Sequence, residues 1–136
     1  MTNVKQAVPF FMVADMEASL RFYVDGLGFR MTKRWEPRGF IEWCWLELGG
    51  VAIMLQQYRE GNLPEQARGL GVSTCFQCAD ALALYKDFTA NGLMPKKPFV
   101  GNGMWVVVIK DPDGYTLDFE SETRVAEETE YDPAVH

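Results

Sequence analysis

The residues that could carry out acid–base or nucleophilic chemistry are few in this sequence. Its one histidine is His136, the C-terminal residue. Ser/His/Asp and Cys/His catalytic arrangements need an imidazole that the fold holds in place, so a terminal histidine argues against both. We therefore predict no catalytic residue of these kinds. Asp118 and Glu47 remain as carboxylates that could serve as a general acid or base.

The cysteines form one motif, Cys75-x-x-Cys78, with Cys44 apart from it. A redox pair needs this motif at a turn that opens a helix, and a zinc site needs a second pair of ligands. The motif lies instead in an apolar, strand-like run, which predicts reduced thiols in the core. A phosphate-binding loop is absent too, because Gly101-Asn102-Gly103 has the pattern of a hairpin turn.

The composition is that of one globular domain and excludes several kinds of partner. A net charge of −6 argues against nucleic acid, because phosphate contacts need clustered Lys and Arg. No apolar run approaches the roughly 18 residues of a membrane span. The first residues, 1–5, lack the basic and apolar pattern of a secretory signal. We expect a cytoplasmic protein with neither a membrane nor a nucleic-acid partner.

The predicted elements run strand, helix and three strands, and then the same order again. Apolar periodicity and turn residues predict strands at 8–13, 29–35, 40–48 and 51–57 in the first set. They predict a helix at 16–27, which Asp15 caps. The second set has predicted strands at 73–78, 93–100, 104–110 and 115–120 and a predicted helix at 81–92, directly after Asp80.

The two halves align with each other, which predicts a duplicated βαβββ unit. Ala14-Asp15 corresponds to Ala79-Asp80, and Gly50 corresponds to Gly114. We predict one domain over 1–120, with modules at about 7–57 and 72–120 joined by a linker at 58–71. The acidic segment 121–136 shows little periodicity and is predicted to be a flexible tail or a strap on a partner subunit.

Three motifs, in this order, resemble the vicinal oxygen chelate superfamily of glyoxalases, bleomycin-resistance proteins and dioxygenases. They are VPFFMVAD from Val8 with GLGF from Gly26, LELGGV from Leu46, and DPDGYTLD from Asp111. The similarity covers about residues 7–120. It implies an α+β fold in which two βαβββ modules form an open, eight-stranded cup, with helices outside and a ligand inside.

Metalloenzymes of this superfamily place a His, Glu or Gln on the first and last strand of each module. There a divalent ion chelates two neighbouring substrate oxygens. The resemblance puts these positions at Val8, Met54, Ser73 and Asp118, with Val72 as an alternative to Ser73. Only Asp118 could bind such an ion. We therefore predict no metal and no cofactor, as in the bleomycin-resistance branch, whose cup binds its ligand without metal.

If Met54 faces into the cup, strand alternation predicts which other side chains do so. Val51, Ile53 and Leu55 then pack against the helices. The predicted ligand-binding residues are Phe10, Met12, Trp43, Trp45, Glu47, Met54, Gln56, Ser73, Asp118 and Glu120. Trp35 and Trp105 cannot be assigned to a face. Aromatic rings with a few carboxylates suit an aromatic or cationic ligand.

These patterns predict a homodimeric, metal-independent binding protein. It would sequester a small aromatic or cationic compound, as antibiotic-resistance members of the resembled family do. Two alternatives stay open. One is a lyase-type or dioxygenase-type enzyme of the same superfamily that works without the usual four-ligand metal site. The other is a regulatory or scaffolding protein whose cup is filled by its own side chains.

Overall fold

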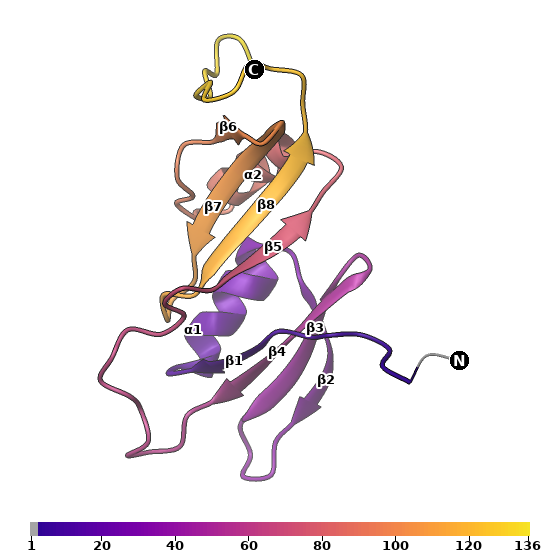
Figure 1. Cartoon of the computed structure of the whole chain (residues 1–136). Coiled ribbons are helices and arrows are strands. Elements are labelled where there is room, and N and C mark those ends of the chain that lie inside the picture. Colours follow the sequence, from indigo (N-terminus) through magenta and orange to yellow (C-terminus); the bar gives the residue numbers. More distant parts are fainter. Residues whose placement is uncertain (1–2) are drawn as a thin grey trace. The chain divides into compact units, whose positions relative to one another are not determined.

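The structure, a computed structural model, describes residues 3–136 and divides into two compact units. Unit 1 is Met1–Gln66 and unit 2 is Ala67–His136. Each unit contains one strand, one helical segment and three further strands, in that order (Figure 1). The division falls inside the segment 58–71, which lacks helices and strands. The prediction of an α+β fold with two βαβββ modules is confirmed.

Unit 1 is a four-stranded mixed sheet with one helical segment. Its elements are β1 (Phe10–Val13), α1 (Met16–Leu20), the π-helical η1 (Arg21–Gly26), β2 (Arg30–Trp35), β3 (Trp43–Leu48) and β4 (Val51–Gln57). The strand order is β1-β4-β3-β2, and only the β1–β4 pair is parallel. The predicted cap opens α1, since the Asp15 carboxylate accepts a hydrogen bond from Ala18 N at 3.3 Å.

The core of unit 1 lies on one face of this sheet. Cys44 and Leu46 on β3 and Ile53 and Leu55 on β4 are fully buried, while the residues between them are partly exposed. This alternation agrees with the predicted one. Val51 differs, because it starts β4 directly after the Gly49-Gly50 turn and is 43% exposed.

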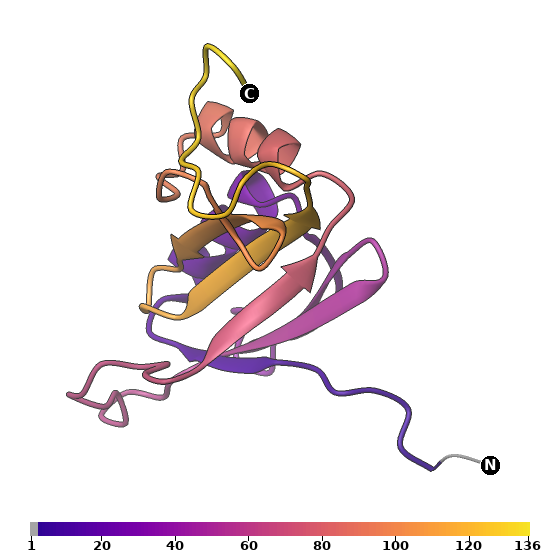
Figure 2. The same ribbon diagram turned by 45° about the horizontal axis from the view of Figure 1, so that its top comes forward.

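Unit 2 repeats the topology of unit 1. Its elements are β5 (Ser73–Gln77), α2 (Ala81–Ala90), β6 (Phe99–Gly101), β7 (Met104–Lys110) and β8 (Thr116–Glu122). The strand order is β5-β8-β7-β6, again with only the outer β5–β8 pair parallel. Asp80 caps α2 by accepting from Ala83 N at 3.0 Å. Helix α2 contacts β7 and β8 and lies along one side of the sheet (Figure 2).

Strands β1, β3 and β6 are shorter than predicted: β3 begins at Trp43 instead of residue 40, and prolines explain the shortening of β1 and β6. β1 begins at Phe10 instead of residue 8, after Pro9. β6 covers only Phe99–Gly101, whereas 93–100 was predicted; Pro95 and Pro98 lie in the missing part. Proline has no N–H to donate to a ladder, so strands tend to begin after it.

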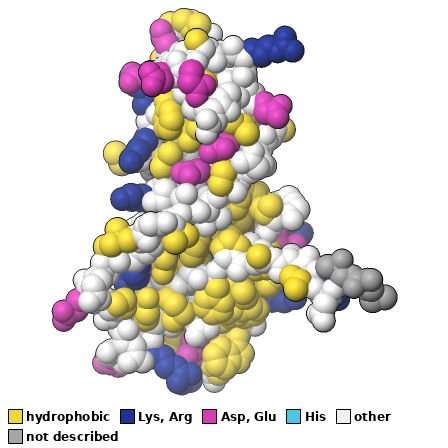
Figure 3. All heavy atoms as spheres, in the orientation of Figure 1, with side chains coloured by type: hydrophobic (Ala, Val, Ile, Leu, Met, Phe, Trp, Pro, Cys, Tyr) yellow, Lys and Arg dark blue, Asp and Glu magenta, His cyan; other side chains and the backbone are white. Residues whose placement is uncertain are grey.

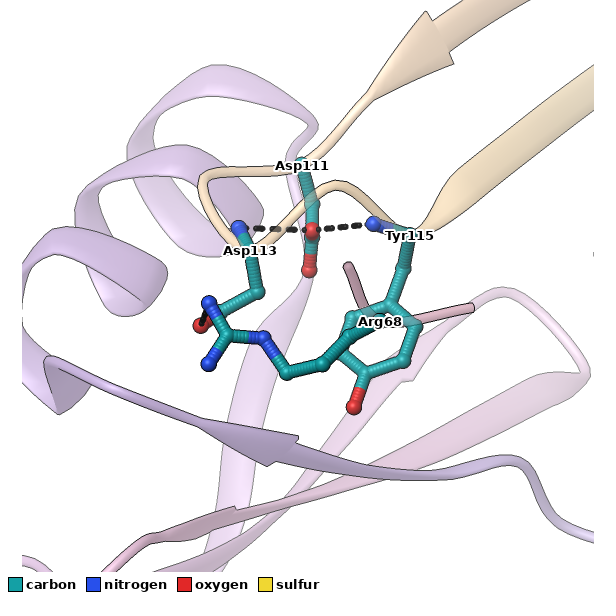
Figure 4. A network of polar contacts seen from close by, with 4 residues as sticks. All are labelled: Arg68, Asp111, Asp113 and Tyr115. Carbon is teal, nitrogen blue, oxygen red and sulfur yellow. Dashed lines mark hydrogen bonds and ion pairs between the residues drawn. The ribbon is translucent and has the colours of Figure 1, made fainter. Parts of the chain in front are cut away.

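The end of the predicted linker is fixed to the closing hairpin of unit 2. Asp111 Oδ1 accepts hydrogen bonds from Asp113 N at 2.9 Å and Tyr115 N at 2.8 Å, which shapes the DPDG turn (Figure 4). Arg68 Nη2 lies 3.0 Å from Asp113 Oδ1, and both side chains are largely buried. Residue 68 therefore belongs structurally to unit 2.

The C-terminal segment differs from the flexible tail predicted for 121–136. Ser121 and Glu122 complete β8, and the chain then pairs with the short strand β6. Val100 N donates to Thr129 O, and Glu128 N donates to Val100 O, both at 2.9 Å. An edge strand offers unpaired backbone groups, and the segment satisfies those of β6. Of the helices in residues 3–136, none is long and apolar enough to cross a membrane.

Candidate functional site

The sheet face of unit 1 opposite its core brings together six of the predicted ligand-binding residues. Phe10, Met54 and Trp45 are lateral neighbours across β1, β4 and β3. Met12, Gln56 and Trp43 form the next row. Because neighbouring strands lie about 4.8 Å apart, side chains on adjacent strands of each row are close enough to contact each other.

Strand β2 adds a tryptophan to this face that strand alternation alone did not assign. A register shift between Met31 and Lys33 changes the alternation of β2, so that Lys33 pairs with Trp45 and Trp35 pairs with Trp43. Trp35 is 48% exposed. A bulge of this kind leaves no clear mark in the sequence, which explains why the face of Trp35 could not be predicted.

We define the aromatic face as Phe10, Met12, Trp35, Trp43, Trp45 and Met54. Phe10 is 47% exposed, and the side chains in the middle of the face are partly exposed. Figure 3 shows hydrophobic side chains gathered over the sheet of unit 1. Soluble proteins rarely leave a contiguous apolar surface of this kind uncovered unless it binds something.

Two polar residues modify the aromatic face. Lys33 Nζ lies 5.0 Å from the centroid of the Trp45 ring, which is a cation–π contact. Glu47, also predicted to bind ligand, lies beside the face and accepts a hydrogen bond from Thr32 Oγ1 at 2.7 Å. One ring face of Trp45 is therefore already in contact with a cation.

The remaining predicted ligand-binding residues lie on unit 2, on the sheet face away from its core. Ser73 pairs with Thr116, Cys75 pairs with Asp118, and Gln77 pairs with Glu120. Gln77 Nε2 donates to Glu120 Oε2 at 3.3 Å and lies 3.1 Å from Cys75 Sγ. This polar face, made of the six residues just named, differs in chemistry from the aromatic face of unit 1.

The cysteines differ from the prediction that all three thiols lie in the core. Cys44 is buried, and its burial raises the pKa of its thiol to about 11. Cys75 is exposed, because it lies on the polar face between Ser73 and Gln77. Desolvation, followed by the nearby Glu120 carboxylate, raises the pKa of Cys75, and desolvation likewise raises the pKa of Cys78. All three thiols therefore stay protonated at neutral pH, and none is an activated nucleophile.

Trp105 and His136 lie away from the polar face of unit 2. Trp105 is buried on the α2 side of the unit 2 sheet. The His136 ring packs edge-on against Trp105 with centroids 4.9 Å apart, and His136 Nδ1 accepts a hydrogen bond from Asp132 N at 3.0 Å. The single histidine thus contributes to the packing of the C-terminal segment.

The four positions that the resemblance assigns to metal, Val8, Met54, Ser73 and Asp118, carry few donor atoms that suit such an ion. Val8 offers no donor atom and Met54 a soft thioether, and Met54 lies between Phe10 and Trp45. On unit 2, the β5 partner of Asp118 is Cys75, whose thiol stays protonated. Within residues 3–136, no group of three His, Cys, Asp or Glu side chains is placed to hold a metal ion. A divalent ion with open substrate positions needs more hard or borderline donors than these.

Comparison with solved structures finds the same fold in several proteins. TioX from Micromonospora sp. ML1 is 20% identical with a TM-score of 0.65, covering 86% of this chain and 99% of that chain. TnmS3, an antibiotic binding protein from Streptomyces sp. CB03234, is 18% identical with a TM-score of 0.67, covering 90% and 100%. A glyoxalase/bleomycin resistance protein/dioxygenase from Nocardioides is 18% identical with a TM-score of 0.66, covering 96% and 93%.

Comparison of sequences agrees with the fold. No curated protein matches the sequence of this chain. The pattern of one family matches residues 5–119, which is most of the chain. Together with the two βαβββ modules, this match shows that the chain belongs to the Glyoxalase/Bleomycin resistance protein/Dioxygenase superfamily.

Proposed function

We propose that this protein is a metal-independent binding protein that sequesters a small, planar aromatic compound on the aromatic face of unit 1. The observation that carries the proposal is the row Phe10, Met54 and Trp45, flanked by Trp43 and Trp35. Flat rings provide large apolar contact areas with little loss of side-chain entropy, which suits binding of another planar group. The printed description of TnmS3 as an antibiotic binding protein supports this class of function.

The charges near the aromatic face set the polarity of the ligand that we propose. Lys33 already lies over Trp45, so a cation on that ring would be repelled by the ammonium group. A neutral aromatic ring meets no such opposition there. The proposed ligand therefore has a neutral aromatic core, and its positive charge, where present, lies outside that core.

A thermal-shift screen of planar aromatic compounds, each tested with and without a cationic substituent, tests this function. A true ligand stabilises the folded protein by RT ln(1 + [L]/Kd), about 2.7 kcal/mol at a concentration of 100 Kd. We expect stabilisation by polycyclic aromatic compounds and none by aliphatic compounds of equal size. Equal stabilisation by the aromatic and the aliphatic compounds would contradict the proposal.

The chemistry of Val8, Met54, Ser73 and Asp118 predicts that the purified protein carries no stoichiometric metal. Elemental analysis after purification without chelators should find well below one zinc, nickel, manganese or iron per chain. About one such ion per chain would overturn the metal-independent account. A glutathione–methylglyoxal lyase activity that EDTA abolishes would do the same.

We also propose that the protein works as a homodimer. Phe10, Trp35 and Phe99 are exposed, and within residues 3–136 no strand pairs with the outer side of β1 or β2. Exposed apolar side chains and unpaired strand edges favour association between identical subunits. Sedimentation at micromolar concentration should show a species of twice the 15.5 kDa chain mass. A single 15.5 kDa species over that range would contradict dimerisation.

A further inference from the structure

Glu42 is a buried carboxylate with an incomplete set of partners. Its backbone is held from two sides, since Glu42 N donates to Trp35 O at 3.0 Å and Gln57 N donates to Glu42 O at 2.9 Å. The residue is only 5% exposed. One carboxylate oxygen pairs with Arg38, whereas Oε2 has no hydrogen-bond partner among residues 3–136.

Such a group needs an explanation, because buried carboxylate oxygens in proteins nearly always accept hydrogen bonds. Glu42 precedes β3, and its side chain lies on the same side of the sheet as the buried Cys44 and Leu46. A glutamate at this place contributes less to the core than an apolar residue of similar size would. Glu42 is therefore a candidate for binding a group that is not part of unit 1.

A cavity adjoins Glu42 within unit 1. It has a volume of about 460 Å³, within the range of small-molecule sites. Besides Glu42, it is lined by Arg38, Phe40, Gln57, Tyr58, Arg59 and Glu60. Phe40 is 47% exposed, although it is a large apolar residue. The cavity thus combines aromatic rings with a recessed carboxylate.

A second cavity, of about 570 Å³, lies next to the first, and the two cavities share the lining residues Phe40 and Gln57. It adds the carboxylates of Asp15, Glu17 and Glu36. Around the two adjoining cavities taken together, carboxylates therefore outnumber the two arginines, Arg38 and Arg59. A cationic ligand is favoured electrostatically over an anionic one.

We propose that this space is a second binding site, for a small organic cation with a flat amidinium or guanidinium head anchored by Glu42. Such a head presents two parallel N–H donors that match the two oxygens of one carboxylate. The ring of Phe40 provides an apolar surface for the body of the ligand. The site is separate from the aromatic face, because Glu42 and Trp43 point to opposite sides of the sheet.

Arg38 is the natural competitor of this ligand. Its guanidinium group pairs with Glu42, but its side chain is half exposed and comes from the turn between β2 and β3. Binding of the cation releases Arg38 into water, where a guanidinium group is well solvated. Removing the arginine side chain should therefore strengthen binding, which a merely structural ion pair does not predict.

Calorimetric titration with benzamidine, and with its neutral analogue benzamide, tests the proposal. We expect benzamidine to bind the native protein and benzamide to bind at least about tenfold more weakly, since only the amidinium pairs with a carboxylate. Glu42→Gln should weaken benzamidine binding at least about tenfold. Glu60→Gln removes the same charge from the cavity lining and should change the affinity less than about threefold.

Two further variants complete the test. Arg38→Gln should tighten benzamidine binding by about threefold or more, as expected when a competing cation is removed. Trp45→Ala should leave the affinity for benzamidine unchanged, because Trp45 lies on the aromatic face. The proposal is overturned if the native protein does not bind benzamidine, if benzamide binds equally well, or if Glu42→Gln binds as the native protein does. If Glu42→Gln does not fold, the Arg38→Gln variant tests the proposal instead. Benzamidine binding to Arg38→Gln that is equal to or weaker than binding to the native protein then overturns the proposal.

Discussion

Replacing Leu55 by Ala is expected to lower the free energy of unfolding by about 2 to 5 kcal/mol. Leu55 is fully buried in the middle of the unit 1 sheet, beside Cys44 on β3 and Phe11 on β1. Removing its branched side chain leaves a cavity that the neighbouring strands cannot close without breaking their hydrogen-bonded register. Denaturant unfolding monitored by circular dichroism measures the loss.

Val51→Ala on the same strand is the matched control. Val51 is exposed at the start of β4, so its truncation should change the free energy of unfolding by less than about 0.5 kcal/mol. A loss of less than about 0.5 kcal/mol in Leu55→Ala as well would mean that the assignment of the core face is wrong. The aromatic face would then have to be assigned to the opposite side of the sheet.

Replacing Trp45 by Ala is expected to weaken the binding of an aromatic ligand by about 1 to 3 kcal/mol, the usual effect of losing a buried aromatic anchor. Trp45 lies in the row with Phe10 and Met54 and is only partly buried, so the protein should stay folded. Calorimetric titration of the native and variant proteins with a ligand found by the thermal-shift screen measures this difference.

Trp45→Phe is the conservative control for this experiment. It keeps a planar ring at the same place and should recover most of the affinity. A loss of stability without any loss of affinity in Trp45→Ala would contradict the proposed site, because it would make Trp45 a core residue. The same ligand should bind Glu42→Gln as it binds the native protein, since Glu42 lies on the other side of the sheet.

Local patterns in the sequence predicted the framework of the fold. The alternation of Ile53, Met54 and Leu55 correctly predicts which side of β4 is buried. Asp15 and Asp80 mark both helix starts, because a carboxylate at this position accepts a hydrogen bond from the first turn. These features depend on neighbours within a few residues, which is why a single sequence suffices to predict them.

The features that the sequence did not predict depend on distant partners or on bulges. The face of Trp35 follows from a register shift in β2. The order of the C-terminal segment depends on β6 and on Trp105, which lies far away in the sequence. Glu42 gave no signal either, because its missing partner is apparent only from its three-dimensional surroundings. Long-range pairings of this kind leave no periodic pattern in the sequence.

The proposed binding role of the aromatic face also cannot be inferred from the fold alone. Folds of one superfamily support unrelated activities, so function must be argued from the residues that line a site. The positions that the resemblance assigns to metal on unit 1 hold Val8 and Met54, and neither is one of the His, Glu or Gln ligands that metalloenzymes of the superfamily use. The aromatic side chains around Met54 are what distinguishes this face from a chelating one.

The most direct test of the central claim uses the four tryptophans as reporters. Their indole N–H signals in ¹⁵N-labelled protein can be followed by NMR while an aromatic ligand from the screen is added. Trp35, Trp43 and Trp45 share the aromatic face, whereas Trp105 is buried beside His136 on unit 2. The account predicts saturable shifts of the Trp43 and Trp45 signals and an unchanged Trp105 signal. A ligand that binds while shifting only Trp105, or none of the four, would contradict it.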